Sequence, residues 1–202
     1  MPKLKRRSIP SGDGAYSSEA APDRFIFSFS NAPKHLRDNP RMKDTIAVYP
    51  GSFDPFTLGH ENLVRRAASI FGQILVAVAA SRQETLFPLA ERVEIAAEVL
   101  RSVPNVEITG FDCLLVDFLR EREARIVVRG VRTLADFEYE ARMMAMNRKL
   151  YPTMETVFLL PSEEHGYLSA SVVREIARHG GDVSQFVPEA VFSRLQRKLC
   201  KF

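Results

Sequence analysis

The 202-residue sequence has no tryptophan, only two cysteines and no apolar run near the ~20 residues that a transmembrane helix needs. Cys113 and Cys200 are too few for a disulfide framework, and such sparse cysteine is typical of a reducing cytoplasm. The first ten residues, MPKLKRRSIP, do not lead into the apolar core of a signal peptide. Hydrophobic residues at 46% and charged residues at 26% exclude a wholly disordered chain.

The net charge of +3 is unevenly distributed along the chain. Residues 1–43 hold nine Lys/Arg and four Asp/Glu, whereas residues 44–202 hold 19 and 21. The basic excess therefore gives no support for a nucleic-acid-binding core. Residues 1–43 are also rich in proline and serine, with apolar density only at 25–29. We expect a disordered N-terminal extension over 1–43, either a regulatory arm or an upstream choice of start codon, and a folded domain over 44–202.

From residue 45 onward, short apolar runs alternate with amphipathic segments. The runs predict strands at 45–49, 74–79, 106–109, 126–128 and 157–160. The amphipathic segments predict helices at 61–71, 88–101, 114–122, 135–150, 171–179 and 188–199. In the second helix we expect an inward face of Val93, Ala96, Ala97 and Leu100. The alternation predicts an α/β fold, a Rossmann-like doubly wound parallel five-stranded sheet buried on both faces by helices.

In such a sheet, ligands bind at the carboxyl ends of the strands. Neither GxGxxG nor GxxxxGK[ST] occurs in the sequence, so the phosphate site must be built differently. The loop after the first strand, YPGSFDPFTLGH over 49–60, offers an alternative. Gly51 permits close backbone approach, Ser52 carries a hydroxyl, and His60 begins a helix whose N–H groups and dipole favour phosphate. A neutral His60 can donate one N–H, and an imidazolium can add charge. A lone histidine here is most often structural, but this convergence favours a phosphate site.

The same loop, SFDP followed by TLGH, resembles the T/HxGH signature of nucleotidylyltransferases related to class I aminoacyl-tRNA synthetases. Two later segments narrow the resemblance: RGVRTLADFEYE over 129–140 and LSASVVRE over 168–175. Together, across residues 45–199, they resemble the bacterial phosphopantetheine adenylyltransferase family. RGVR joined to DFEYE is more specific than the histidine motif, because the corresponding segments differ in the cytidylyltransferase and nicotinamide-mononucleotide branches.

The resemblance implies reversible transfer of an adenylyl group from ATP to 4′-phosphopantetheine, giving dephospho-coenzyme A and pyrophosphate in coenzyme A biosynthesis. It implies Mg²⁺ carried with ATP, a cytoplasmic homo-oligomer (a hexamer), and coenzyme A as a feedback inhibitor. We expect no metal site in the protein, since no His/Cys/Asp spacing indicates one, and no nucleic-acid or membrane partner. The attacking phosphate is already ionised, so such a reaction needs positioning and positive charge rather than a side-chain nucleophile.

The resemblance also assigns site residues. His60 matches the histidine that stabilises the transition state. Ser52 replaces a threonine that contacts both substrates, and it keeps the hydroxyl. Leu115 and Arg129 match positions that hold the pantetheine substrate. The ATP-binding residues implied in this way are Ser52, Phe53, His60, Gly130, Val131, Arg132, Glu140, His165, Gly166, Tyr167, Leu168, Ser169, Ala170 and Ser171.

One segment departs from the family pattern. After the second strand the family has a lysine-bearing loop that contacts substrate phosphate, but here it is SRQETLF over 81–87, one residue shorter and without lysine. Either Arg82, whose long side chain ends in a fork of donors, reaches the same phosphate, or Glu84 repels substrate and the enzyme is slow or re-specialised. In the first case Arg82→Ala should lower turnover sharply and Glu84→Lys should add little. In the second case Arg82→Ala should change little and Glu84→Lys should restore turnover.

Two further functions stay open on the sequence alone. One is a related nucleotidylyltransferase with a different phosphorylated acceptor, and the other is a nucleotide- or coenzyme-A-binding module with weakened catalysis. Pyrophosphate release from ATP and 4′-phosphopantetheine, with calorimetry where turnover is absent, separates all three.

Overall fold

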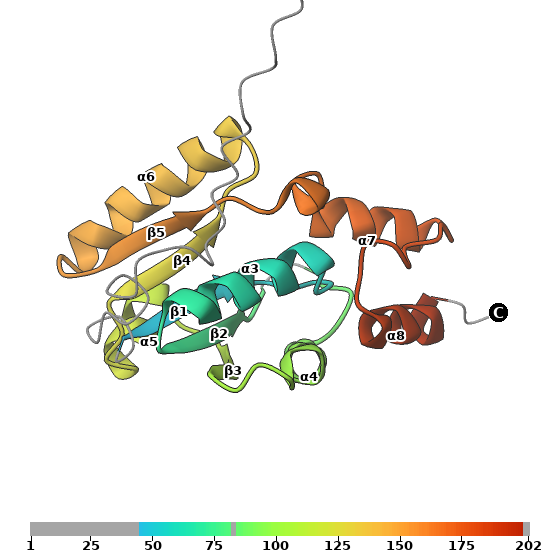
Figure 1. The fold of residues 1–202 in the computed structure, drawn as a ribbon, viewed down its shortest axis with the longest axis horizontal. Helices are drawn as coiled ribbons and strands as arrows, with labels where there is room; N and C mark the ends of the chain where they lie inside the picture. Colours follow the sequence, from blue (N-terminus) through green and yellow to red (C-terminus); the bar gives the residue numbers. More distant parts are fainter. Residues whose placement is uncertain (1–44, 82–83, 200–202) are drawn as a thin grey trace, which may run out of the picture. The chain divides into compact units, whose positions relative to one another are not determined.

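The computed structural model describes residues 45–81 and 84–199, so the predicted extension at 1–43 lies outside the described residues (Figure 1). The strands are β1 (Ile46–Gly51), β2 (Gln73–Ala79), β3 (Val106–Phe111), β4 (Ile126–Gly130) and β5 (Glu155–Leu159). The helices are α3 (Leu58–Ile70), α4 (Leu89–Leu100), α5 (Leu115–Glu121), α6 (Leu134–Leu150), α7 (Ala170–Arg178) and α8 (Glu189–Leu199), with a 3₁₀ turn η2 (Glu163–His165). No helix in these ranges is long and apolar enough to cross a membrane.

All five strands pair in parallel, in the order β3-β2-β1-β4-β5. The first strand, β1, lies in the middle of the sheet; from there the order runs outward through β2 to β3, and the chain then crosses back to place β4 on the other side of β1. This arrangement confirms the predicted doubly wound α/β fold. The strand order reverses between β1 and β4, and that is where such folds bind ligands.

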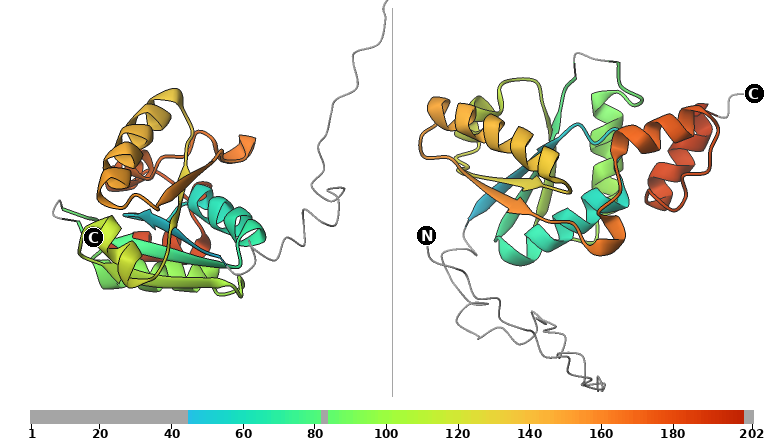
Figure 2. Two further views of the ribbon diagram at one scale, coloured as in Figure 1. Left: turned by 90° about the vertical axis from the view of Figure 1, so that its left-hand side faces the viewer. Right: turned by 90° about the horizontal axis from the view of Figure 1, so that it is seen from above.

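Helices cover both faces of the sheet, as the two views of Figure 2 allow the reader to follow. Neighbouring residues of β2 alternate between two apolar clusters: Val76 and Val78 pack with α3, α4, α7 and α8, and Leu75 and Ala77 pack with α5. Burial on both faces holds for β1 and β2 but not for β3 and β5, whose residues are only partly buried or exposed. Each of these two strands has a neighbour on one side only.

The buried face of α4 differs from the predicted one. Ala97 is exposed, and the helix instead buries Ile95 and the charged side chain of Arg92, which is 1% exposed. Burying a guanidinium is tolerated only where its N–H groups find acceptors, and Arg92 donates to three backbone carbonyls. Helical periodicity places an arginine on the surface by default, so the pattern could not identify this residue.

The five strands and the two apolar clusters described above lie within residues 45–199. We therefore expect that deleting residues 1–41, so that the chain starts at Met42, leaves the melting temperature and the rate of pyrophosphate release unchanged. Thermal unfolding and an activity assay on the full and shortened chains test this. A large loss of melting temperature would show that the deleted residues belong to the domain.

Candidate active site

A cavity of about 320 Å³ lies at the carboxyl ends of β1 and β4, the position that the strand order indicates. Its lining residues are Tyr49, Ser52, Thr57, Gly59, His60, Leu63, Gly130, Arg132, Pro161, His165, Leu168, Ser169, Ala170, Ser171 and Arg174. A larger surface groove of about 400 Å³ is lined by residues of α4 and α8. None of its lining residues is a predicted site residue, whereas the strand-end cavity is lined by many of them, so we place the active site at the strand-end cavity.

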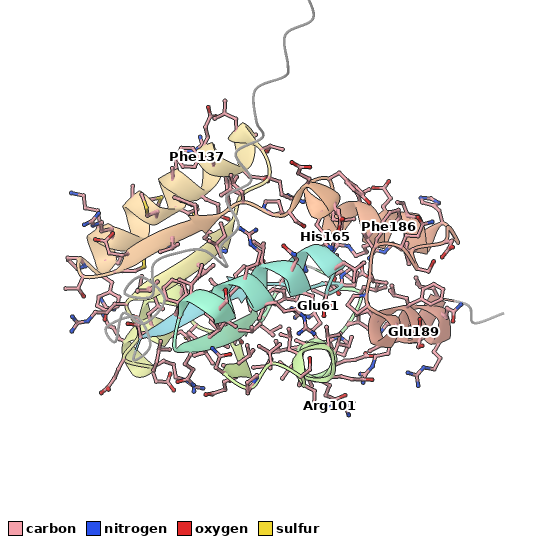
Figure 3. The ribbon with its side chains drawn as sticks, viewed as in Figure 1. Glu61, Arg101, Phe137, His165, Phe186 and Glu189 are labelled. Atoms are coloured by element: carbon pink, nitrogen blue, oxygen red, sulfur yellow. The ribbon has the colours of Figure 1, made fainter. Side chains whose placement is uncertain are left out.

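Most of the predicted ATP-binding residues line this cavity. They are Ser52, His60, Gly130, Arg132, His165, Leu168, Ser169, Ala170 and Ser171. His165 belongs to η2, which packs against α3 near the start of α7 (Figure 3). Five other predicted residues lie outside the cavity lining: Phe53, Val131, Glu140, Gly166 and Tyr167. Phe53 and Val131 are buried and Tyr167 is 69% exposed, so any direct contact of these three with nucleotide remains a prediction.

His60 is held by the first turn of α3. Thr57 is the N-cap, and its backbone N–H donates to His60 Nδ1 at 3.0 Å, while its Oγ1 accepts from the His60 backbone N–H at 3.4 Å. This reciprocal capping arrangement fixes the imidazole orientation. A backbone N–H can only donate, so Nδ1 must be the unprotonated nitrogen, and the proton of the neutral ring is on Nε2. His60 can therefore offer one N–H donor.

The surroundings of His60 favour the neutral ring over an imidazolium. The rings of Phe53 and Phe56 lie with their centroids 5.1 and 5.5 Å from the imidazole centroid. Burial, assisted by the positive charge of Arg132, lowers the pKa of His60 to about 4. Of the two chemical roles that the sequence left open, the structure selects the neutral hydrogen-bond donor.

Close packing beneath the cavity depends on two glycines. A Cβ on Gly51 would lie 2.9 Å from the Phe53 ring. The absence of a side chain at Gly51 therefore lets the Phe53 ring pack closely against the Gly51 backbone. Phe53 itself has a φ of 49°, a left-handed conformation that is rare for a bulky residue. A Cβ on Gly130 would clash with Leu63 Cδ1. Both glycines thus let the first loop and α3 pack tightly under the cavity.

Arg132 joins two of the loops around the cavity. Its Nε lies 3.0 Å from Asp136 Oδ2, and its Nη1 donates to the Leu168 carbonyl at 2.6 Å. Burial raises the pKa of Asp136, but the hydrogen bonds and charge of Arg132 outweigh burial and hold the pKa below its usual range. Asp136 therefore stays ionised and keeps the guanidinium at the cavity edge.

Arg174 is a second cation of the cavity, which the sequence analysis did not identify. Its Nη1 donates to the Asp54 carbonyl at 2.5 Å and lies 3.3 Å from Asp54 Oδ2. Arg174 follows Ser171 by three residues on α7, so both residues lie on the same helix face. That spacing from a predicted site serine is the signal that could have identified it.

Of the three residues assigned to the pantetheine substrate, Ser52 lines this cavity, and Leu115 and Arg129 do not. Arg129, on β4, donates to the Pro50 carbonyl at 3.1 Å and pairs with Glu140 at 3.2 Å. Leu115 begins α5 and packs against the apolar cluster on that face of the sheet. The lysine-poor loop is only partly described: Glu84 is exposed, and Arg82 lies outside the described residues. The alternatives for Arg82 therefore stay predictions.

Comparison with known proteins shows the family of this chain. The sequence profile of the cytidylyltransferase-like family matches residues 48–176. The phosphopantetheine adenylyltransferase of Aromatoleum aromaticum is 60% identical over 159 residues, which cover 78% of this chain and 98% of the relative. The chain belongs to the phosphopantetheine adenylyltransferase family. A second member, from Polynucleobacter necessarius, is 55% identical over 156 residues, or 77% of this chain and 94% of the relative.

Solved structures agree with the fold that is expected for a phosphopantetheine adenylyltransferase family member. Nicotinic acid mononucleotide adenylyltransferase of Plasmodium falciparum has a TM-score of 0.57 at 12% identity, covering 76% of this chain and 95% of that one. A bifunctional NMN adenylyltransferase/ADP ribose pyrophosphatase of Francisella tularensis has a TM-score of 0.60 at 14% identity, covering 76% and 49%. At such identity the likeness concerns the fold alone.

Proposed function

We propose that the cavity transfers an adenylyl group from ATP to 4′-phosphopantetheine, giving dephospho-coenzyme A and pyrophosphate. One observation carries the proposal: the Ser52 hydroxyl, the neutral His60 and the guanidinium groups of Arg132 and Arg174 surround a single cavity. Membership of the phosphopantetheine adenylyltransferase family supports the choice of substrates.

In this reaction a phosphate oxygen of the acceptor forms a bond to the α-phosphorus of ATP. The bond between the α-phosphorus and the oxygen that bridges it to the β-phosphorus breaks. The electron pair of that bond stays on the oxygen, which leaves as part of pyrophosphate. The acceptor phosphate is already ionised, so no general base is required. Two polyanions must approach each other, and positive groups such as Arg132 and Arg174 offset their repulsion. His60 Nε2–H is suited to donate to a phosphoryl oxygen as its charge changes in the transition state.

We propose that Mg²⁺ enters with ATP. Within residues 45–81 and 84–199 no three side chains among His, Cys, Asp and Glu are grouped closely enough to hold a metal ion. Mg²⁺ is commonly bound by substrate phosphates with only one or two carboxylates. ATP phosphate oxygens would therefore be its main ligands, and the ion would reduce the negative charge that the acceptor phosphate meets.

Pyrophosphate release on mixing ATP, Mg²⁺ and 4′-phosphopantetheine tests the function directly. Turnover with another phosphorylated acceptor in place of 4′-phosphopantetheine would favour a re-specialised nucleotidylyltransferase. Calorimetric binding of ATP or coenzyme A without turnover would favour a binding module instead.

We also propose a cytoplasmic homo-oligomer, a hexamer in keeping with the family, with coenzyme A as a feedback inhibitor. Helix α6 supports self-association: it has no buried residue, and it exposes Leu134, Phe137, Tyr139, Met146 and Leu150. Phe137 is labelled on this helix in Figure 3. Apolar side chains gathered on one helix commonly mark a protein–protein interface. The sparse cysteine content supports the cytoplasm.

Arg129→Ala is expected to raise KM for 4′-phosphopantetheine by about tenfold, the effect of losing one charge-assisted contact. The substitution removes a cation at the end of β4 that is held by Pro50 and Glu140. Steady-state kinetics with each substrate varied in turn measures the effect. Glu140→Gln, which keeps Arg129 but removes its ion-pair partner, is the matched variant: it should raise KM for ATP, and it should raise KM for 4′-phosphopantetheine less than Arg129→Ala does. An Arg129→Ala effect confined to ATP would contradict the assignment.

A further inference from the structure

Two buried charged side chains lie just outside the cavity lining. Asp54 and Arg92 are each 1% exposed, and with Thr57 they are the buried polar residues of the described part of the chain. Neither appears among the residues of the predicted site. Burying a charge is costly unless it is paired and hydrogen-bonded, so the partners of these two groups indicate what they hold in place.

Asp54 connects three segments of the chain. Its two carboxylate oxygens accept the backbone N–H groups of Leu86 and Phe87, at 2.8 and 3.0 Å, just before α4. The same carboxylate lies 3.3 Å from Arg174 Nη1 on α7. The Asp54 backbone carbonyl accepts from that Nη1 as well, at 2.5 Å. One side of the cavity cation Arg174 is therefore fixed by the loop after β1.

Arg92 connects the same loop to the sheet. Its Nη1 donates to the carbonyl of Ser52 at 2.5 Å and to the carbonyl of Ala79, the last residue of β2, at 2.8 Å. Its Nε donates to the Phe87 carbonyl at 3.0 Å. The backbone of the cavity residue Ser52 is thus held to the end of β2 and to the segment before α4.

We propose that Asp54 and Arg92 act together as positioning residues, a buried brace that sets the separation between the Ser52 hydroxyl and the Arg174 guanidinium. Both halves of the brace meet at Phe87, whose N–H donates to Asp54 and whose carbonyl accepts from Arg92. The two side chains make five hydrogen bonds to backbone groups. Apolar side chains could fill the same space, but they would not fix the orientation of the backbone as directional hydrogen bonds do.

The role rests on the proposed adenylyl transfer, which requires two bound phosphates to meet in line. Each substrate alone can bind to a slightly displaced Ser52 or Arg174. The reaction cannot tolerate such displacement, because an error of about 1 Å in a near-attack geometry can cost about 100-fold in rate. Loosening the brace should therefore lower kcat much more than it weakens binding of either substrate.

Asp54→Asn tests the brace with little change in volume. The amide replaces one acceptor oxygen with a donor, so it opposes the Phe87 N–H in one orientation and both the Leu86 N–H and Arg174 in the other. We expect kcat to fall by more than about tenfold, while Kd for ATP or for 4′-phosphopantetheine alone changes by less than about threefold. Leu119→Ala, buried on the opposite face of the sheet, is the control: it should lower the melting temperature but change kcat by less than about twofold.

Arg92→Lys gives a second variant in case Asp54→Asn does not fold. It keeps the charge but loses the planar fork that reaches three carbonyls, and we expect the same split between kcat and Kd. Hydrogen exchange at Leu86 and Phe87 should speed up in both variants and not in Leu119→Ala, whatever the substrate. Unchanged kcat, or unchanged exchange, would overturn the brace. If the wild-type chain releases no pyrophosphate, the proposed function fails, and the exchange rates still decide whether the brace exists.

Discussion

His60→Ala is expected to lower kcat by about 1,000-fold while changing Kd for ATP by less than about threefold. The Nδ1 atom of His60 accepts the Thr57 N–H, so the single N–H of the neutral ring is at Nε2 and is free to donate to a ligand. A donor of this kind interacts more strongly with the transition state than with bound ATP, so its loss falls on the rate. Single-turnover kinetics and calorimetric binding measure the two quantities.

His60→Gln is the matched variant, since its terminal amide can place one N–H donor near the position of Nε2. It should recover part of the lost rate, whereas alanine should not. Near-normal turnover in His60→Ala would remove this residue from the mechanism.

The lowered pKa of His60 also makes a prediction about stability. Between its folded pKa of about 4 and the value of 6.5 expected in the unfolded chain, only the unfolded state binds the proton. The free energy of unfolding should therefore rise with pH across that interval, by roughly 3 kcal/mol from this residue, and should level off at higher pH. Denaturant unfolding between pH 4 and 7 should show a flatter profile in His60→Ala than in the wild-type chain. An unchanged slope would mean that His60 titrates normally.

Arg132→Ala is expected to lower kcat/KM for ATP by about 100-fold or more. The guanidinium is a cation of the cavity, and it also joins Asp136 on α6 to the Leu168 carbonyl before α7. Its removal takes away positive charge where phosphates are proposed to meet, and it separates two loops that line the site. Initial rates with ATP varied at saturating 4′-phosphopantetheine measure the loss.

Two variants make the Arg132 result specific. Arg132→Lys keeps the charge but lacks the fork that bridges Asp136 and Leu168, so it should recover only part of the activity. Arg194→Ala removes a cation on α8 that is paired with Glu98 of α4, and it should leave kcat/KM unchanged. The charge of Arg132 helps to lower the pKa of His60, so Arg132→Ala should also raise the pKa of that imidazole, measured by NMR. A His60 pKa that does not move would show that the two residues are not coupled.

The sequence alone was sufficient for the fold, and it predicted a site in the loops after the strands, where the structure has a cavity. Uninterrupted apolar runs such as 74–79 are typical of strands buried on both faces, and their alternation with helices allows few arrangements other than a parallel sheet. Ser52 and Arg132 lie at one cavity because each comes just after a strand and the strands end at a common edge, and His60 reaches it from the first turn of α3. These are local signals, carried by residues close together along the chain.

Tertiary structure decided the protonation of His60, the burial of Arg92, the role of Arg174 and the position of Arg129 outside the cavity. Arg174 meets Asp54 across 120 residues of sequence, and Arg92 meets the Ser52 carbonyl across 40. No periodicity or spacing encodes such contacts, because they depend on how the loops after different strands pack. From sequence alone, a charged side chain is predicted to be exposed. It can be buried only where the fold brings carbonyls or carboxylates within hydrogen-bonding distance.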